Sequence, residues 1–274
     1  MIGPVEPFYP TLMSAWTGEL KLLLEREPTV SPRGMQIRES IFRSFSVVDP
    51  TTFPFMVTGR NLKHVVGLLE GLSNVGQVSV PEMYTDRIQN FLQFEDDGIF
   101  YGAYGGRLHG QIGDLVQRFR EDPDTRQGVL SIYDGTRDLS QHKRDIPCTV
   151  SVQFLMRNGR LHMHVNMRSN DIWLGTPYDL VQFSILQLTL AQALDLAPGC
   201  YRHTVGSLHL YERDVEKARQ VEPFETIGTM PFPLWRATEL QDIVRRARRI
   251  LAGQELGERT AFEQWAHGLL WESE

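Results

Sequence analysis

Two alternating stretches joined by an Asn-Gly pair constrain the fold of this chain more than any other feature. Residues 148–156 and 161–167 each alternate apolar and polar side chains, as a strand with one buried face does. Asn158 and Gly159 between them suit a tight two-residue turn, because both residues tolerate a positive φ. The sequence therefore predicts a β-hairpin over residues 148–168.

The rest of the chain mixes strand and helix patterns. We expect further strands over 129–133 and 201–211, helices over 11–26, 61–72 and 178–194, and two more helices after residue 234. No repeat, low-complexity run or linker divides the sequence. The prediction is an α+β protein in which residues 1–274 form a single domain, with a large, mostly antiparallel or mixed sheet flanked by helices.

Charge and composition exclude several classes of protein. The 28 Lys and Arg residues against 34 Asp and Glu give a net charge of −6, so we expect no stable nucleic-acid partner. Two cysteines are too few for a disulfide framework, and the apolar stretch 180–196 is too polar to cross a membrane. We predict a reduced, cytoplasmic protein without a metal site.

Four ordered segments carry a dense set of polar residues among strand patterns. They are Asp122-Pro123-Asp124-Thr125-Arg126, Pro147-Cys148, the run from Arg168-Ser169-Asn170-Asp171 to Leu174-Gly175-Thr176-Pro177, and Gly206-Ser207-Leu208-His209-Leu210-Tyr211. In this order the chain resembles the thymidylate synthase family, and within it the branch of cytidylate (CMP or dCMP) 5-hydroxymethylases. The resemblance implies the thymidylate-synthase fold and 5,10-methylenetetrahydrofolate as the one-carbon donor.

The resemblance also assigns roles around a bound nucleotide. Cys148 matches the nucleophile that adds to C6 of a pyrimidine, and Arg168 matches an arginine that lies beside it and also binds the phosphate. Further matches to substrate-binding residues are Ser169 and Arg126 for the phosphate, Arg33 and Arg38 for a phosphate-binding loop, and His209 and Tyr211 for the sugar 3′-hydroxyl. Because the arginine matching Arg126 comes from the second subunit in this family, a homodimer with shared active sites is implied.

Three more residues complete the predicted site. Tyr104 matches a tyrosine that assists proton removal from C5, and Asp171 matches the carboxylate that contacts the folate. His64 stands where the alignment places a catalytic glutamate of the family; an imidazole there would serve as a base toward water. Glu70 is the nearest carboxylate, but at six positions away it falls on a different helical face.

Asp179 points to the nucleobase. Synthases that act on uracil have an asparagine at the matching position, whereas a carboxylate accepts better from the amino group of cytosine. The alternative is an acidic residue in the first turn of the helix after Pro177. We therefore predict hydroxymethylation of a cytidine monophosphate, CMP slightly before dCMP, in nucleoside-antibiotic biosynthesis or phage DNA modification. A C5-methylating enzyme acting on dUMP or dCMP and a non-catalytic nucleotide-binding member remain the alternatives.

Overall fold

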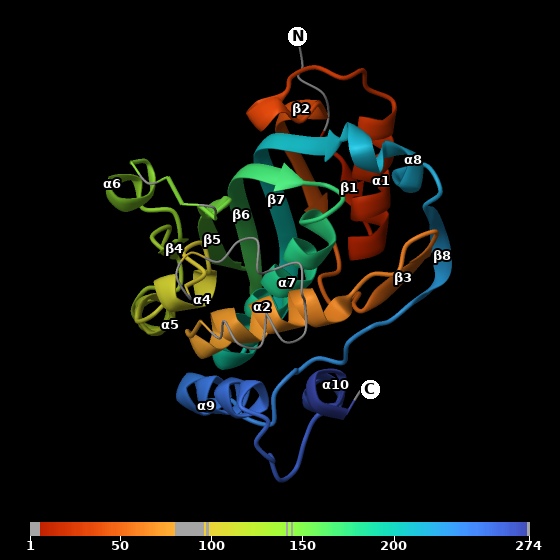
Figure 1. Ribbon diagram of the computed structural model, residues 1–274. Coiled ribbons are helices and arrows are strands. Elements are labelled where there is room, and N and C mark those ends of the chain that lie inside the picture. Colours follow the sequence, from red (N-terminus) through yellow and green to blue (C-terminus); the bar gives the residue numbers. More distant parts are fainter. Residues whose placement is uncertain (1–5, 80–95, 97–98, 141, 144, 273–274) are drawn as a thin grey trace.

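The computed structural model describes residues 6–79, 96, 99–140, 142–143 and 145–272 (Figure 1). Its strands are β1 (Phe8–Tyr9), β2 (Ile37–Val47), β3 (Phe55–Thr58), β4 (Val129–Ser131), β5 (Thr149–Arg157), β6 (Arg160–Asp171), β7 (Ala197–Tyr211) and β8 (Glu222–Ile227). The helices are α1 (Leu12–Leu24), α2 (His64–Gly76), α4 (Tyr104–Arg107), α5 (Gln111–Glu121), α6 (Gly135–Asp138), α7 (Thr176–Ala193), α8 (Val215–Ala218), α9 (Leu240–Leu251) and α10 (Ala261–His267). Short helical turns η1 (Pro32–Gly34), η3 (Glu212–Asp214) and η4 (Gly268–Glu272) complete them.

The strands of the central sheet run in the order β1-β2-β7-β6-β5-β4. The pairs β2/β7, β6/β5 and β5/β4 are antiparallel, while β1/β2 and β7/β6 are parallel, so the sheet is mixed as predicted. The predicted hairpin is confirmed, and its turn residues Asn158 and Gly159 have φ angles of 53° and 68°. Positive φ at both positions twists the turn in the sense that matches the strands. β3 and β8 form a separate two-stranded sheet.

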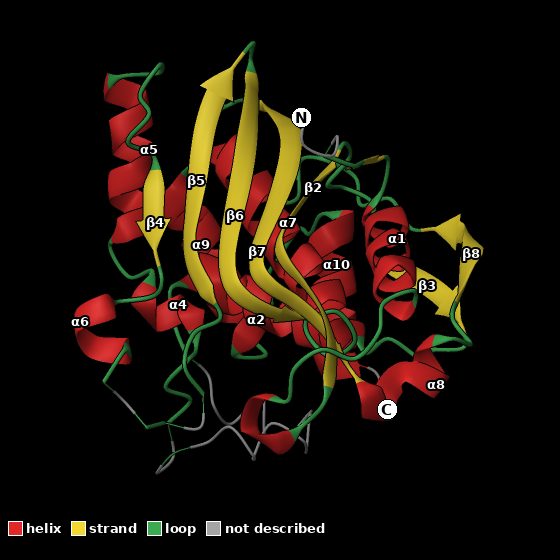
Figure 2. Cartoon of the chain, turned by 90° about the horizontal axis from the view of Figure 1, so that it is seen from above, coloured by secondary structure: helices red, strands yellow, loops and turns green. Residues whose placement is uncertain are grey.

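Helix α7 lies at the centre of the molecule. All of its residues except Tyr178 are buried, between the sheet on one side and α2 on the other. Helix α9 packs in turn on α2. Figure 2 shows α2, α7 and α9 behind β5, β6 and β7, with no described helix in front of these three strands. The buried apolar side chains form one cluster that joins α1, the sheet, α2, α7, α9 and α10.

The predicted elements are found close to their expected bounds. α1 begins at Thr11, whose hydroxyl accepts from the backbone N–H of Ser14 in a capping box, and α7 has Pro177 in its first turn. The sequence did not predict α5 or the strands β1, β2, β3 and β8. None of the described helices has both the length and the apolar character needed to cross a membrane.

Two glycines of α2 allow it to approach α7 closely. A methyl group at Gly67 would lie 3.0 Å from the backbone oxygen of Tyr178, and one at Gly71 would lie 2.7 Å from Cδ1 of Ile185. Backbone cannot move aside as a flexible side chain can. The spacing of α2 and α7, and with it every side chain between them, therefore depends on these small residues.

We predict opposite effects for the same substitution at two helical glycines. Gly67→Ala is expected to destabilise the fold by about 1–3 kcal/mol because the methyl group meets the Tyr178 backbone. Gly113→Ala in α5 meets nothing within 4 Å and is expected to stabilise the protein by about 0.5–1 kcal/mol through helix propensity. Urea unfolding of both variants tests this. Equal stability of the two would contradict the close α2–α7 contact.

Candidate active site

Cys148 and Arg168 meet where the two strands of the hairpin begin and end. Cys148 directly precedes β5, and the backbone N–H of Arg168 on β6 donates to its carbonyl oxygen at 2.8 Å. The guanidinium of Arg168 donates to the carbonyl oxygens of Pro147 (2.9 Å) and Ile146 (2.8 Å), and Nη2 lies 3.9 Å from Sγ of Cys148. The chain before the thiol thus holds the arginine beside it.

Burial and nearby charges act in opposite directions on the pKa of the Cys148 thiol. Burial raises the pKa of Cys148 to about 11, because a thiolate loses its hydration there. The positive charges of Arg168 and Arg33 lower this pKa, while the carboxylates of Asp179 and Asp145 raise it further. The reactivity of the thiol therefore depends on how much positive charge lies next to it.

Tyr104 begins the one-turn helix α4 beside the first residue of β5. Its hydroxyl oxygen accepts from the backbone N–H (3.2 Å) and the hydroxyl (3.1 Å) of Thr149, the residue after Cys148, and its ring stacks on Phe183. Burial raises its pKa well above the ordinary value, and the charge of Cys148 adds to this. A phenol that accepts two hydrogen bonds keeps its own hydrogen for a third partner at the site.

Some of the residues predicted to bind the phosphate and the sugar lie at the same end of the sheet as the Cys148 thiol. Arg33, exposed on η1, is near enough to lower the pKa of both Cys148 and Tyr211. Tyr211 packs edge-on against His209, with ring centroids 5.2 Å apart. Ser169 is half-buried on β6 in register with Ser207. These residues belong to one end of the sheet.

Two arginines predicted for the phosphate have other surroundings. Arg38 donates to Glu212 at 2.7 Å and to the carbonyl oxygen of Leu24, and its side chain is only 12% exposed. It acts there as a structural ion pair, so Arg33 is the better candidate for the phosphate. Arg126 is exposed at the edge of the sheet, as an arginine donated to a second subunit would be.

His64 and Glu70 have different surroundings on α2. The ring of His64 packs edge-on against Phe55, and burial lowers its pKa. Glu70 lies on another face of α2, where its carboxylate accepts from Nε2 of Gln182 at 2.9 Å. Its pKa is raised well above the ordinary value by burial and then by the charge of Asp179. The contacts of α2 therefore favour Glu70 over His64 as the residue in the place of the family's catalytic glutamate.

The signal for Glu70 was present in the sequence. It is a single acidic residue in the apolar run Leu68-Leu69-Glu70-Gly71-Leu72, and a carboxyl group on such a face must be buried with a partner. The alignment at the start of the helix drew attention to His64 instead.

Asp179 lies in the first turns of α7 and is almost fully buried. Its Oδ2 accepts from Nδ2 of Asn170 at 2.7 Å, and its Oδ1 accepts from Nε2 of Gln182 at 2.8 Å. Burial raises the pKa of Asp179 to about 7, although these two hydrogen bonds act against the shift. Its charge also reaches Cys148 and Tyr104. A simple helix-capping role does not explain a buried carboxylate whose charge acts on the thiol.

The surroundings of Asp171 suit a folate. Its Oδ1 accepts from the backbone N–H groups of Trp173 (2.8 Å) and Leu174 (3.0 Å). Arg60 lies close by, with its guanidinium 4.1 Å from the ring centre of Trp173, and its buried Nη1 has no hydrogen-bond partner among the described residues. A cation with a free donor, an indole ring and a carboxylate fit a pterin ring and its acidic tail. Residues 81–94, where the tryptophans that usually enclose the folate were not recognised in the sequence, fall outside the described residues.

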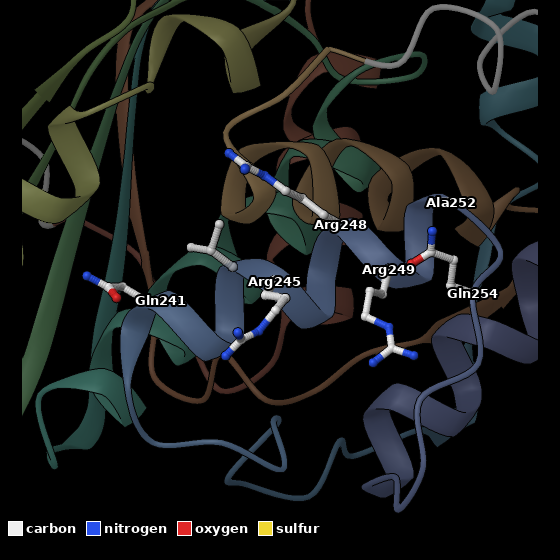
Figure 3. Close-up of a pocket in the computed structure, with 7 residues that line it drawn as sticks. Gln241, Arg245, Arg248, Arg249, Ala252 and Gln254 are labelled. Atoms are coloured by element: carbon white, nitrogen blue, oxygen red, sulfur yellow. The ribbon is translucent and has the colours of Figure 1, made fainter.

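A surface groove of about 470 Å³ lies along α9, away from these residues (Figure 3). It is lined by Gln241, Val244, Arg245, Arg248, Arg249, Ala252 and Gln254. None of the predicted site residues lines it. Arg248 donates to the carbonyl oxygen of Gly76 at the end of α2, which favours a structural role for that arginine.

A half-buried cysteine lies beside an arginine at one end of a mixed sheet, and carboxyl groups of α2 and α7 lie behind it. The thymidylate synthase family model matches residues 76–231, which is more than half of the chain. The chain belongs to the thymidylate synthase family.

The chain is also similar to individual proteins whose names give an activity. The chain is 31% identical over 213 residues to the deoxyuridylate hydroxymethyltransferase of Bacillus phage SP01, covering 71% of this chain and 56% of that protein. It is 31% identical over 177 residues to the enzyme of the same name from Pseudomonas phage M6, covering 62% and 49%. A bifunctional dihydrofolate reductase-thymidylate synthase of Zea mays is 34% identical over 133 residues, covering 48% and 24%. The chain thus spans about half the length of the two phage proteins.

We predict that Arg168→Gln slows alkylation of Cys148 by iodoacetamide about tenfold at pH 8.5. Loss of the neighbouring positive charge raises the thiol pKa, and each unit lowers the thiolate fraction tenfold. Mass spectrometry resolves Cys148 from Cys200. Arg202→Gln is the matched control, because Arg202 lowers the pKa of Cys200 and not that of Cys148. Unchanged alkylation of Cys148 in Arg168→Gln would contradict the pairing.

Proposed function

We propose that this protein is a folate-dependent 5-hydroxymethylase of a cytidine monophosphate. The observation that carries the proposal is Asp179, a buried carboxylate in the position from which the family recognises the base, close to the Cys148 thiol. The names of the two phage relatives support hydroxymethyl transfer. For the sugar, the sequence-based prediction of CMP before dCMP stands.

Cys148 is the proposed nucleophile. Its thiolate adds to C6 of the pyrimidine, and the electron pair of the C5–C6 double bond moves to C5, which then attacks a one-carbon unit. Arg168 lowers the pKa of the thiol, and the phosphate of the nucleotide brings its own charge to Arg33 and Arg168. His209 and Tyr211 are the proposed partners of the 3′-hydroxyl.

Two half-buried groups are suited to move protons. Tyr104 lies beside the residue after Cys148, and we assign it a role in removing the proton from C5. Glu70 has a raised pKa, so it keeps its proton to a higher pH than an exposed glutamate does. Loss of the C5 proton would release the tetrahydrofolate amine from the one-carbon unit and leave an exocyclic methylene on the nucleotide. We assign Glu70 to the water that adds to this carbon, after which the C6–S bond breaks, the C5–C6 double bond re-forms and Cys148 is released. His64, the sequence-based candidate for this base, lacks such contacts.

5,10-Methylenetetrahydrofolate would supply the one-carbon unit at the oxidation level of formaldehyde. Asp171, Trp173 and Arg60 are the proposed contacts, since a carboxyl group, a ring face and an N–H without a partner among the described residues suit it. Folate at this position would cover the nucleotide base and exclude bulk water from the thiol.

Uracil is the second candidate base. Both phage relatives are named for deoxyuridylate. With a pKa of about 7, Asp179 accepts from the cytosine amino group above neutrality and donates from its protonated oxygen to uracil O4 below it. Use of a cytidine nucleotide is therefore expected to rise with pH through 7, whereas use of a uridine nucleotide should fall.

Mass spectrometry of products tests the proposed reaction. The protein is incubated with 5,10-methylenetetrahydrofolate and CMP, dCMP, UMP or dUMP at pH 6 and pH 8. Gain of CH2O on a cytidine nucleotide is expected, more strongly at pH 8. Gain of CH2 indicates a methylating enzyme, and hydroxymethylation of a uridine nucleotide alone assigns the second base.

The Cys148→Ser variant is the control for covalent catalysis. It is expected to bind the nucleotide and to form no product, because a hydroxyl is a far weaker nucleophile at this pH. The absence of product from the native protein with all four nucleotides would favour a non-catalytic nucleotide-binding protein.

We propose that residues 1–274 act as one catalytic domain in a homodimer. No described helix covers one face of β5, β6 and β7 (Figure 2). Ser151, Asn166 and Thr204 are half-buried polar residues that pair in one row across these strands. A second copy on this face would bring an exposed Arg126 toward the phosphate site of its partner. Ile41 and Phe42 on β2 are 64% and 83% exposed, which also suits an interface.

Subunit complementation tests the shared site. Arg126→Ala and Cys148→Ser homodimers are each expected to have low or no activity. Mixed and reassembled in equal amounts, they should recover about a quarter of native activity, since half of the dimers are mixed and each mixed dimer has one intact site. Activity no higher than the sum of the parents would contradict sharing.

A further inference from the structure

Asn170 is held in one orientation by residues of β7 and α7. The buried hydroxyl of Tyr201 has a single hydrogen-bond partner among the described residues, Nδ1 of His203 at 2.9 Å, so Nδ1 accepts. Burial lowers the pKa of His203 to about 3, so the ring is neutral and its hydrogen is on Nε2. That N–H donates to Oδ1 of Asn170 at 3.1 Å, and the hydroxyl of Thr176 lies 2.8 Å from the same oxygen.

The consequence is that Asn170 turns its NH2 group toward Asp179. Nδ2 of Asn170 and Oδ2 of Asp179 are 2.7 Å apart. Gly175 leaves room for this pair, since a methyl group there would lie 3.0 Å from Nδ2 and 3.2 Å from Oδ2. The amide cannot turn over without removing the acceptor of the His203 N–H.

Gln182 lies on the other side of Asp179, and its side-chain amide also turns its NH2 group toward that residue. Its Nε2 lies 2.8 Å from Oδ1 of Asp179 and 2.9 Å from Oε2 of Glu70, and its Oε1 accepts from Nδ2 of Asn74 at 2.8 Å. As long as either carboxyl group is ionised, an amide oxygen in this place would face an acceptor with no hydrogen between them, so the nitrogen of Gln182 is the atom that faces both. Both side-chain amides therefore present N–H groups to Asp179.

We propose that Asn170 and Gln182 are specificity-determining positioning residues, because two fixed amide donors require a residue that accepts on both atoms at position 179. Only a carboxylate does so. An asparagine there would place its own NH2 group against that of Asn170 or of Gln182, whichever way it turned. The base preference of the site is thus set by three residues together. This inference rests on the proposed role of Asp179 in recognising the base.

The exchange variant Asn170→Asp/Asp179→Asn tests this directly. The carboxylate introduced at position 170 would accept from His203, from Thr176 and from the amide introduced at position 179. The oxygen of that new amide would still accept from Gln182. The total charge is conserved, and the amide at position 179 keeps one N–H and one lone pair for a base. That pair of groups matches O4 and N3–H of uracil.

The first measurement is a double-mutant cycle of unfolding in urea. Each single substitution is expected to destabilise the protein. In Asp179→Asn, the new NH2 group faces the NH2 group of Asn170 or of Gln182, and in Asn170→Asp, the new carboxylate faces that of Asp179. Each single substitution raises the unfolding equilibrium constant by some factor. In the exchange variant, the increase should be at least about tenfold smaller than the product of these two factors. This readout needs no substrate. Additive effects would overturn the proposal.

The second measurement is kcat/KM for CMP and UMP, or for dCMP and dUMP if the product assay assigns the deoxyribonucleotide. Asp179→Asn is expected to lower use of the cytidine nucleotide at least about tenfold and to leave use of the uridine nucleotide poor. The exchange variant should raise use of the uridine nucleotide at least about tenfold over Asp179→Asn alone. A role in stability alone would not move this ratio.

The control variant is Asn158→Asp/Asp179→Asn, which adds a carboxylate in the exposed β5–β6 turn. It should behave as Asp179→Asn does. The outcomes separate the two proposals: an unchanged base preference in Asp179→Asn contradicts the proposed function, whereas the cycle of unfolding still tests the amide pair. A shifted preference without rescue by the exchange variant overturns the inference about Asn170.

Discussion

The burial of α7 between the sheet and α2 is the constraint on which the rest of the molecule depends. Polar groups on this enclosed helix need partners, since an unpaired buried group costs about 1–3 kcal/mol. Among the described residues, only Oγ of Ser184 and Oε1 of Gln187 on this helix are buried side-chain atoms without one. Asp179 and Gln182 find theirs on β6 and α2. The glycines of α2 bring the two helices close enough for these bonds to form. The close contact of α2 and α7 therefore sets both the packing of the core and the geometry of the site.

The same enclosure sets the chemistry. Water is scarce around Cys148, Glu70 and Asp179, so burial raises the pKa of all three, and nearby charges then act on them in a medium of low polarity. Arg168 is fixed by the carbonyl oxygens that precede Cys148, which places its charge without the help of a substrate. The thiol is held as a weak acid whose activation depends on nearby positive charge.

Much of this arrangement could be predicted from residue order. The hairpin, the helix after Pro177 and the segments around Cys148, Arg168 and His209 are local patterns, and the structure has them close to their predicted bounds. The roles of Arg38 and His64 stay predictions, because an alignment of local sequence does not say which partner a side chain meets. Arg38 meets Glu212, distant in sequence, and Glu70 meets Gln182 across a helix interface.

The sequence by itself determined strands β4 to β7 of the sheet, the family to which the chain belongs and the presence of a cysteine, arginines and a carboxylate in order along it. Periodicity and turn chemistry are properties of neighbouring residues, so they can be read without a fold. Only the tertiary structure decided that Asn170 and Gln182 both donate to Asp179, and that Glu70 joins them. Those contacts join β6, β7, α2 and α7, and their orientation follows from partners such as His203 and Tyr201, whose positions no local pattern specifies.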